Sequence, residues 1–157
     1  MGGSNMEAPG KGLLKVVGIL FIIRGVILLI IALLAMLGAA MMQNPETLQA
    51  LEQQGVAVDV SGGAAWLAAI VALVAAALDL VTGILGVKNS KKPEKAQTCF
   101  IMGIIIIAFL IVNAAISAVD GSLNIIWTAI SLVLPVLYLW GALKNKEALS
   151  GSSQGEV

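Results

Sequence analysis

The stretch that decides the fold is Leu13–Met42, LLKVVGILFIIRGVILLIIALLAMLGAAMM, in which Lys15 and Arg24 are the charged residues. A helix needs about 20 mostly apolar residues to cross the hydrocarbon core of a bilayer, roughly 30 Å thick. The run is also far longer than the apolar region of a secretory signal, about 7–15 residues. The sequence therefore predicts a retained helix that crosses a membrane.

Three further stretches have the same apolar character, and each contains a charged residue, an asparagine or a proline. They are Ala64–Val87 with Asp79, Ala96–Val119 with Asn113, and Ser122–Leu143 with Pro135. Long apolar runs without alternation exclude the strands of a membrane barrel and favour helices. The predicted fold is an all-α membrane protein, a bundle of four transmembrane helices that forms a single domain over residues 11–146.

Composition excludes several other classes of protein. The chain has 157 residues, of which 59% are hydrophobic and 11% charged, with nine basic residues, nine acidic residues, one Cys and no His. Soluble domains are about 45–50% apolar and about 25% charged. The zero net charge argues against nucleic acid as a partner. Without His, and with Cys99 alone, the usual zinc, iron–sulfur and haem ligands and the commonest catalytic base are missing. We therefore expect no cofactor, no metal and no enzyme activity.

The charged residues predict the orientation of the helices. Eight lysines fall at the start of the first span, between the second and third spans, and after the fourth: Lys11, Lys15, Lys88, Lys91, Lys92, Lys95, Lys144 and Lys146. In the two connections on the opposite side, every charged residue is acidic. These residues are Glu46, Glu52, Asp59 and Asp120. Because lysine and arginine concentrate on the cytoplasmic side, we expect a multi-pass protein of the cell membrane with both termini in the cytoplasm.

The connection over residues 43–63 contains a predicted short helix. Asn44 and Pro45 have the residue types of an N-cap and a first helical position, and Gly55 has that of a helix stop. Leu48 and Leu51 give the intervening segment one apolar face. This predicts a short amphipathic helix in the first extracytoplasmic loop. The tails, residues 1–10 and 147–157, are predicted to be disordered.

Each span carries a stripe of small or polar residues when it is followed in steps of three and four. In lipid, small residues let helices approach closely, and polar residues form hydrogen bonds between helices. The second span has the stripe Ala65, Ala68, Ala72, Ala75, Asp79, Thr82 and Gly86. The polar residues predicted to face the bundle interior are Asn113, Ser117, Thr82, Thr128, Ser131 and Tyr138, with Asn113 bonding across helices. The stripes fit either packing seams or a polar path.

Two charged residues lie deep inside the predicted spans, away from the span ends. Arg24 is nine residues from Lys15, and Asp79 is nine residues from Lys88 on the next span. At about 1.5 Å per residue, both lie at a similar depth. This predicts an ion pair between them, which would fix the register of two helices or form a proton- or ion-coupled site. Alternatively, Arg24 extends to the lipid headgroups.

The segments Leu80–Ala96 (LVTGILGVKNSKKPEKA) and Leu134–Lys146 (LPVLYLWGALKNK) resemble those of small, uncharacterised four-span bacterial membrane proteins. The resemblance implies the four-span fold and carries no activity or site residue with it. Two functions fit the residues: a non-enzymatic accessory, assembly or structural subunit in lipid, as a homo-oligomer or with other membrane subunits, or a small ion or solute channel or transporter using Arg24 and Asp79. The residues disfavour a third alternative, a lipid-modifying enzyme, because one side offers mainly lysines and Glu94 and the other side isolated acidic residues.

Overall fold

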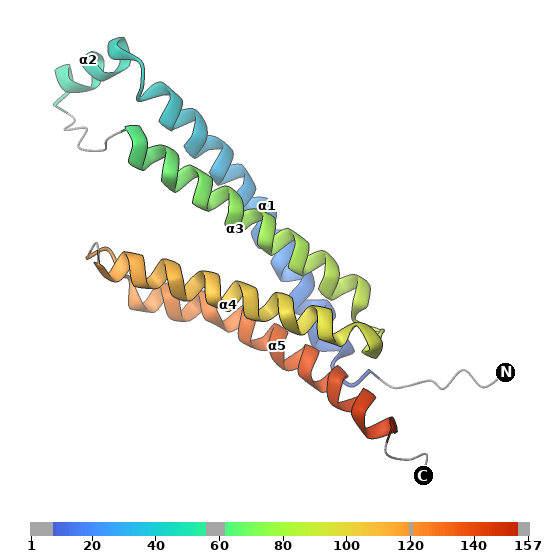
Figure 1. Cartoon of the computed structure of the whole chain (residues 1–157). Coiled ribbons are helices and arrows are strands. Elements are labelled where there is room, and N and C mark those ends of the chain that lie inside the picture. Colours follow the sequence, from blue (N-terminus) through green and yellow to red (C-terminus); the bar gives the residue numbers. More distant parts are fainter. Residues whose placement is uncertain (1–7, 56–61, 120, 154–157) are drawn as a thin grey trace. The chain divides into compact units, whose positions relative to one another are not determined.

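The computed structural model describes residues 8–55, 62–119 and 121–153, and the regular elements within these ranges are all helical (Figure 1). In chain order they are α1 (Lys11–Met41), α2 (Pro45–Gln53), α3 (Gly62–Asn89), the short 3₁₀ helix η1 (Pro93–Lys95), α4 (Ala96–Val119) and α5 (Ile125–Ser153). Of these, α1, α3, α4 and α5 are long and apolar enough to cross a membrane. The prediction of four long apolar helices is confirmed.

The chain ends differ from the sequence prediction. The segment after residue 146 was expected to be disordered, but α5 continues through Ser153, and the Ser150 hydroxyl donates to the Glu147 carbonyl (2.9 Å). Lys, Glu, Ala and Leu are good helix formers, and extending a helix that already exists costs little. At the other end, Gly10 is buried and hydrogen-bonded rather than part of a free tail. Residues 1–7 and 154–157 lie outside the described part of the chain.

The connection between α1 and α3 contains α2. Asn44 is its N-cap, and the Asn44 side-chain oxygen accepts a hydrogen bond from the Glu46 amide (3.1 Å). Pro45 is the first helical residue, and Gly55 follows the helix with a φ of 73°, a conformation that favours glycine. Asp59 and Asp120, two of the acidic residues behind the predicted orientation, fall outside the described residues.

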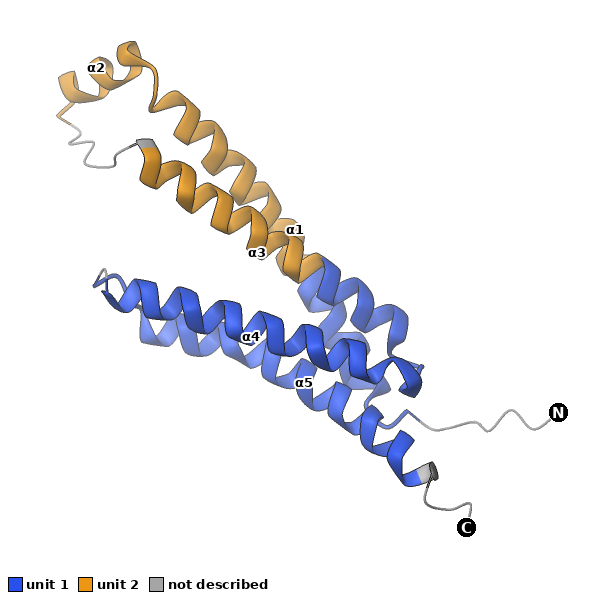
Figure 2. Cartoon of the chain, in the orientation of Figure 1, with its two compact units in different colours: residues 1–22, 81–157 blue, residues 23–80 orange. Residues whose placement is uncertain are grey.

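The chain divides into two compact units, shown in Figure 2. Unit 1 comprises residues 1–22 and 81–157, and therefore holds the start of α1, the end of α3, and all of η1, α4 and α5. Unit 2 comprises residues 23–80, with the rest of α1 and α3 and the whole of α2.

Glycines bring the helices of unit 1 into close contact. A Cβ at Gly83 of α3 would lie 2.7 Å from the Gly18 carbonyl oxygen of α1, and a Cβ at Gly103 of α4 would lie 2.6 Å from Leu139 Cδ2 of α5. Gly86 is similarly close to Tyr138. Helices in lipid associate where small residues allow such an approach, so these glycines set the seams of unit 1.

The outward faces of the long helices are apolar. Leu34 and Leu37 on α1 are each 62% exposed, and Ile125 and Ile126 on α5 are 73% and 74% exposed. Soluble monomers rarely expose continuous apolar surface on this scale. A lipid bilayer is the environment that such surfaces fit, as in a multi-pass membrane protein.

Candidate intramembrane site

Unit 2 contains a bidentate ion pair between its two long helices. Arg24 of α1 donates from Nε to Asp79 Oδ2 (2.6 Å) and from Nη2 to Asp79 Oδ1 (2.7 Å). The Asp79 side chain is 3% exposed, and the Arg24 side chain is 26% exposed. The structure thus has the direct contact, and not the alternative in which Arg24 extends away from Asp79. Two parallel charge-assisted bonds fix both distance and orientation.

The residues next to the pair allow it to form. Gly25 follows Arg24, and a Cβ at Gly25 would lie 2.9 Å from Leu80 Cγ and 3.0 Å from the Leu80 amide nitrogen. Leu80 in turn follows Asp79 in α3. The missing side chain at Gly25 therefore lets α1 and α3 approach at the level of the pair. Farther along the same two helices, the buried residues of unit 2 are alanines: Ala32, Ala39, Ala69 and Ala76.

In unit 1, Tyr138 and Thr82 are brought together. The Tyr138 hydroxyl donates to the Thr82 carbonyl oxygen (3.0 Å), and both side chains are buried. The Tyr138 ring also meets Phe21 of α1 edge to face, with the centroids 5.6 Å apart. The Thr82 hydroxyl is buried with no hydrogen-bond partner within the described ranges. Tyr138 therefore joins α5 to both α1 and α3.

The other four polar residues predicted for the bundle interior are half-buried: Asn113, Ser117, Thr128 and Ser131. The expectation that Asn113 bonds across helices is wrong. Its side-chain nitrogen donates to the Phe109 carbonyl, four residues earlier in α4 (2.9 Å). A short polar side chain can reach its own helix backbone at this spacing, so Asn113 does not need a partner helix.

Sequence reasoning missed a buried cluster at the end of unit 1, formed by Gly10, Ser90 and Asn145 and called the asparagine cluster below. The Asn145 side-chain oxygen accepts from the Gly10 amide (2.7 Å), and its nitrogen donates to the Ser90 carbonyl (3.1 Å). Ser90 also donates from its hydroxyl to the Val87 carbonyl (2.9 Å). One side chain thus connects the start of α1, the α3–η1 connection and α5.

Replacing Asn145 with leucine is expected to lower the free energy of unfolding by about 2 kcal/mol, because the buried Gly10 amide and Ser90 carbonyl lose their partner. Amide hydrogen exchange at residues 8–12 should become faster. The matched control is Asn113→Leu, which breaks a bond within one helix and is expected to leave stability unchanged or slightly raised. Equal losses in both variants would contradict this role for Asn145.

In the described part of the chain, no group of three or more His, Cys, Asp or Glu residues is placed to hold a metal ion. No protein-family model, no curated protein and no solved structure matches this chain. What is shown is a helical protein with four long apolar helices, as in a multi-pass membrane protein.

Proposed function

We propose that this chain is a non-enzymatic multi-pass membrane protein that acts as an accessory, assembly or structural subunit. In this proposal its partners are the lipid bilayer and either further copies of itself or other membrane subunits. The three lysine-bearing segments, and with them both termini, lie on the cytoplasmic side of the cell membrane, following the usual distribution of basic residues.

The observation that carries the proposal is the use made of polar side chains inside the apolar helices. Arg24 and Asp79 bond to each other, Tyr138 bonds to the Thr82 carbonyl, and Asn113 bonds to its own helix. The first two contacts each join two helices. Polar groups used in this way hold a bundle together, which supports a role that depends on packing.

One observation favours a second function, a small ion or solute channel or transporter. Charged residues within membrane spans are costly to place there, and they often belong to ion or proton pathways. Arg24 and Asp79 are such residues, and the Arg24 side chain is partly exposed. In this alternative the ion pair takes part in transport as well as in packing.

Flux measurements on two proteins separate these functions. Wild type and the exchanged variant Arg24→Asp/Asp79→Arg are reconstituted into liposomes, and ion and solute flux are recorded after circular dichroism shows that both are helical. We expect no flux from either protein, and stable folding of the exchanged variant. Flux through wild type that disappears in the folded exchanged variant would overturn the subunit proposal in favour of transport.

A further inference from the structure

The helices of unit 1 form two pairs with matching sequences. The start of α1 and the end of α3 make the first helix pair, and α4 and α5 make the second. Gly18-Ile-Leu-Phe21 of α1 corresponds to Gly103-Ile-Ile-Ile106 of α4. Leu85-Gly-Val-Lys-Asn89 of α3 corresponds to Gly141-Ala-Leu-Lys-Asn145 of α5. Counting along each helix from these segments gives further residues of the first pair an equivalent in the second.

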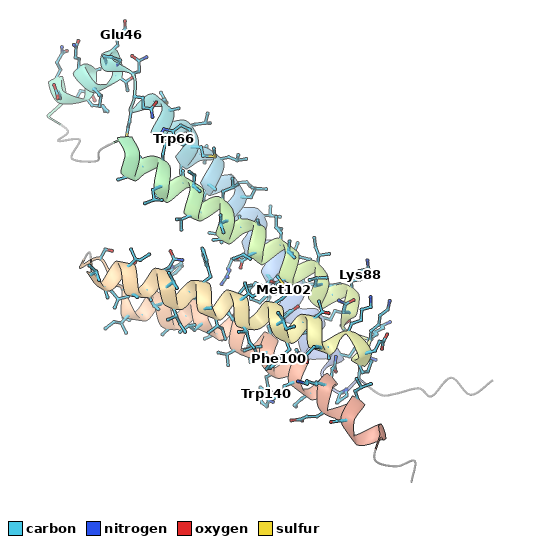
Figure 3. The ribbon with its side chains drawn as sticks, in the orientation of Figure 1. Glu46, Trp66, Lys88, Phe100, Met102 and Trp140 are labelled. Carbon is cyan, nitrogen blue, oxygen red and sulfur yellow. The ribbon has the colours of Figure 1, made fainter. Side chains whose placement is uncertain are left out.

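Equivalent residues of the two pairs have similar burial. The following buried residues of the first pair have buried equivalents in the second: Leu14 and Cys99, Gly18 and Gly103, Phe21 and Ile106, Thr82 and Tyr138, Gly86 and Ala142, and Asn89 and Asn145. On the outward side, Ile84 is 53% exposed and its equivalent Trp140 is 54% exposed. Lys88 and its equivalent Lys144 are exposed too, and Lys88 and Trp140 are labelled in Figure 3. The match therefore extends from residue types to the faces of the helices.

The contact inside each helix pair lies at the same place. A Cβ at Gly18 would lie 2.9 Å from the carbonyl oxygen of Gly83, which joins α1 to α3. A Cβ at Gly103 would lie 2.6 Å from Leu139 Cδ2, which joins α4 to α5. Gly103 is the equivalent of Gly18, and Leu139 is the equivalent of Gly83. The two helices of each pair therefore pack in the same register.

The contacts between the two pairs are reciprocal. Gly141 of α5 packs on Leu14 of α1, since a Cβ at Gly141 would lie 3.4 Å from Leu14 Cβ. The equivalents of these two residues are Leu85 of α3 and Cys99 of α4, and they are in contact as well. The Cys99 thiol donates to the Leu85 carbonyl oxygen (3.7 Å). Reciprocal contacts of this kind are the signature of an interface formed about a two-fold axis.

Thr82 and Tyr138 mark the position of the axis. They are equivalents of each other, and the Tyr138 hydroxyl donates to the Thr82 carbonyl oxygen (3.0 Å). A residue can contact its own equivalent only close to the axis. We infer that unit 1 consists of two copies of one helix pair, related by an approximate two-fold axis that passes between Thr82 and Tyr138 along the direction of the helices, as in parallel repeats. The packing face of each pair is thus an interface for a pair of its own kind.

The test exchanges the two residues at the axis. The Tyr138 ring fits beside α3 because Gly86 has no side chain, and a Cβ at Gly86 would lie 2.6 Å from Tyr138 Cε2. The equivalent of Gly86 is Ala142, so the axis places a tyrosine at position 82 against the methyl group of Ala142. The exchanged protein Thr82→Tyr/Tyr138→Thr should therefore be strained at Ala142, and the further substitution Ala142→Gly should relieve that strain.

Thermal unfolding of the full chain in lipid nanodiscs, followed by circular dichroism, compares wild type and the exchanged protein, each with and without Ala142→Gly. The exchange alone is expected to lower the midpoint by roughly 10 °C. Ala142→Gly should lower the midpoint of wild type by about 3 °C, because glycine is a poorer helix former than alanine. In the exchanged protein the same substitution should raise the midpoint by about 5 °C. The matched control Ala129→Gly, at an exposed position of α5, should raise neither midpoint.

Two results would overturn the inference. The first is an equal fall of the midpoint on Ala142→Gly in wild type and in the exchanged protein. The second is an exchanged protein that is as stable as wild type without Ala142→Gly, because no methyl group would then stand where the axis places one. Should the exchanged protein not fold, Thr82→Leu gives the same comparison with a smaller side chain. Ala142→Gly must then lower its midpoint less than that of wild type, and an equal or larger fall would overturn the inference.

Discussion

The Arg24→Ala variant is expected to lose about 3–5 kcal/mol of unfolding free energy, the usual cost of removing one partner from a buried ion pair. The variant removes the countercharge of Asp79, whose side chain is 3% exposed. Asp79→Ala should cost less, because Arg24 is already 26% exposed and its long side chain can extend to lipid headgroups. Unfolding in mixed micelles, followed by circular dichroism, measures both losses.

Two controls sharpen this prediction. Arg24→Lys keeps the positive charge but loses the two-bond geometry, so an intermediate loss is expected. Lys88→Ala removes an exposed charge at the end of α3 and should change stability by less than about 0.5 kcal/mol. If Arg24→Ala is as stable as wild type, the ion pair does not stabilise the contact between α1 and α3.

Gly83→Val should be nearly as damaging, at about 3 kcal/mol, the upper part of the usual range for overpacking. A Cβ at Gly83 would lie 2.7 Å from the Gly18 carbonyl oxygen and 2.8 Å from the Ile22 amide nitrogen. Both are backbone atoms, which cannot rotate away as the end of a flexible side chain can. The start of α1 and the end of α3 would have to separate, and thermal unfolding would measure the cost.

The matched control is Gly38→Val, in the last turn of α1, where an added Cβ meets nothing within 4 Å. Valine is a better helix former than glycine, so this variant is expected to be as stable as wild type or slightly more stable. A similar loss of stability in both variants would contradict this prediction. It would mean that valine destabilises these helices in general, and that the close approach of Gly83 to Gly18 is not the cause.

The positions of the four long helices could be predicted from the sequence because one strong physical requirement decides them. A helix that crosses a bilayer must be mostly apolar over the full thickness of the hydrocarbon core, and few helices of soluble proteins have so long an apolar run. Arg24 and Asp79 could be paired for a related reason. Charged residues deep inside membrane spans are rare. Because Arg24 and Asp79 lie at similar depth on consecutive spans, each had few other candidate partners.

The side of α3 that faces its neighbour was predicted less well. The stripe through Ala65, Ala68, Ala72 and Ala75 does not contain Ala69 and Ala76, the two alanines that are buried. Alanines occur on several faces of this segment, so their spacing cannot select one face. Toward the other end of the helix the predicted stripe is right, since Asp79, Thr82 and Gly86 are all buried. Polar residues and glycines are fewer there than alanines are in the first half, so their spacing selects one face.

The asparagine cluster was missed because Asn145 lies between two lysines, in a segment that resembles the polar end of a span. A signal was nevertheless present. When the fourth predicted span is followed in the same steps of three and four, its stripe is Asn124, Thr128, Ser131, Pro135, Tyr138 and Ala142. A further step of three residues along α5 reaches Asn145. Tyr138, Ala142 and Asn145 are all buried. The partners of Asn145 could not be predicted, since both are backbone groups far away in the sequence.

Arg24 and Asp79 join α1 to α3, and a double-mutant cycle between the two positions measures how strongly they do so. The cycle compares the unfolding free energies of wild type, Arg24→Ala, Asp79→Ala and the double variant in one lipid mixture. We expect a coupling of about 2 kcal/mol or more, with the double variant more stable than Arg24→Ala alone. Additive losses, with no coupling between the two positions, would contradict it.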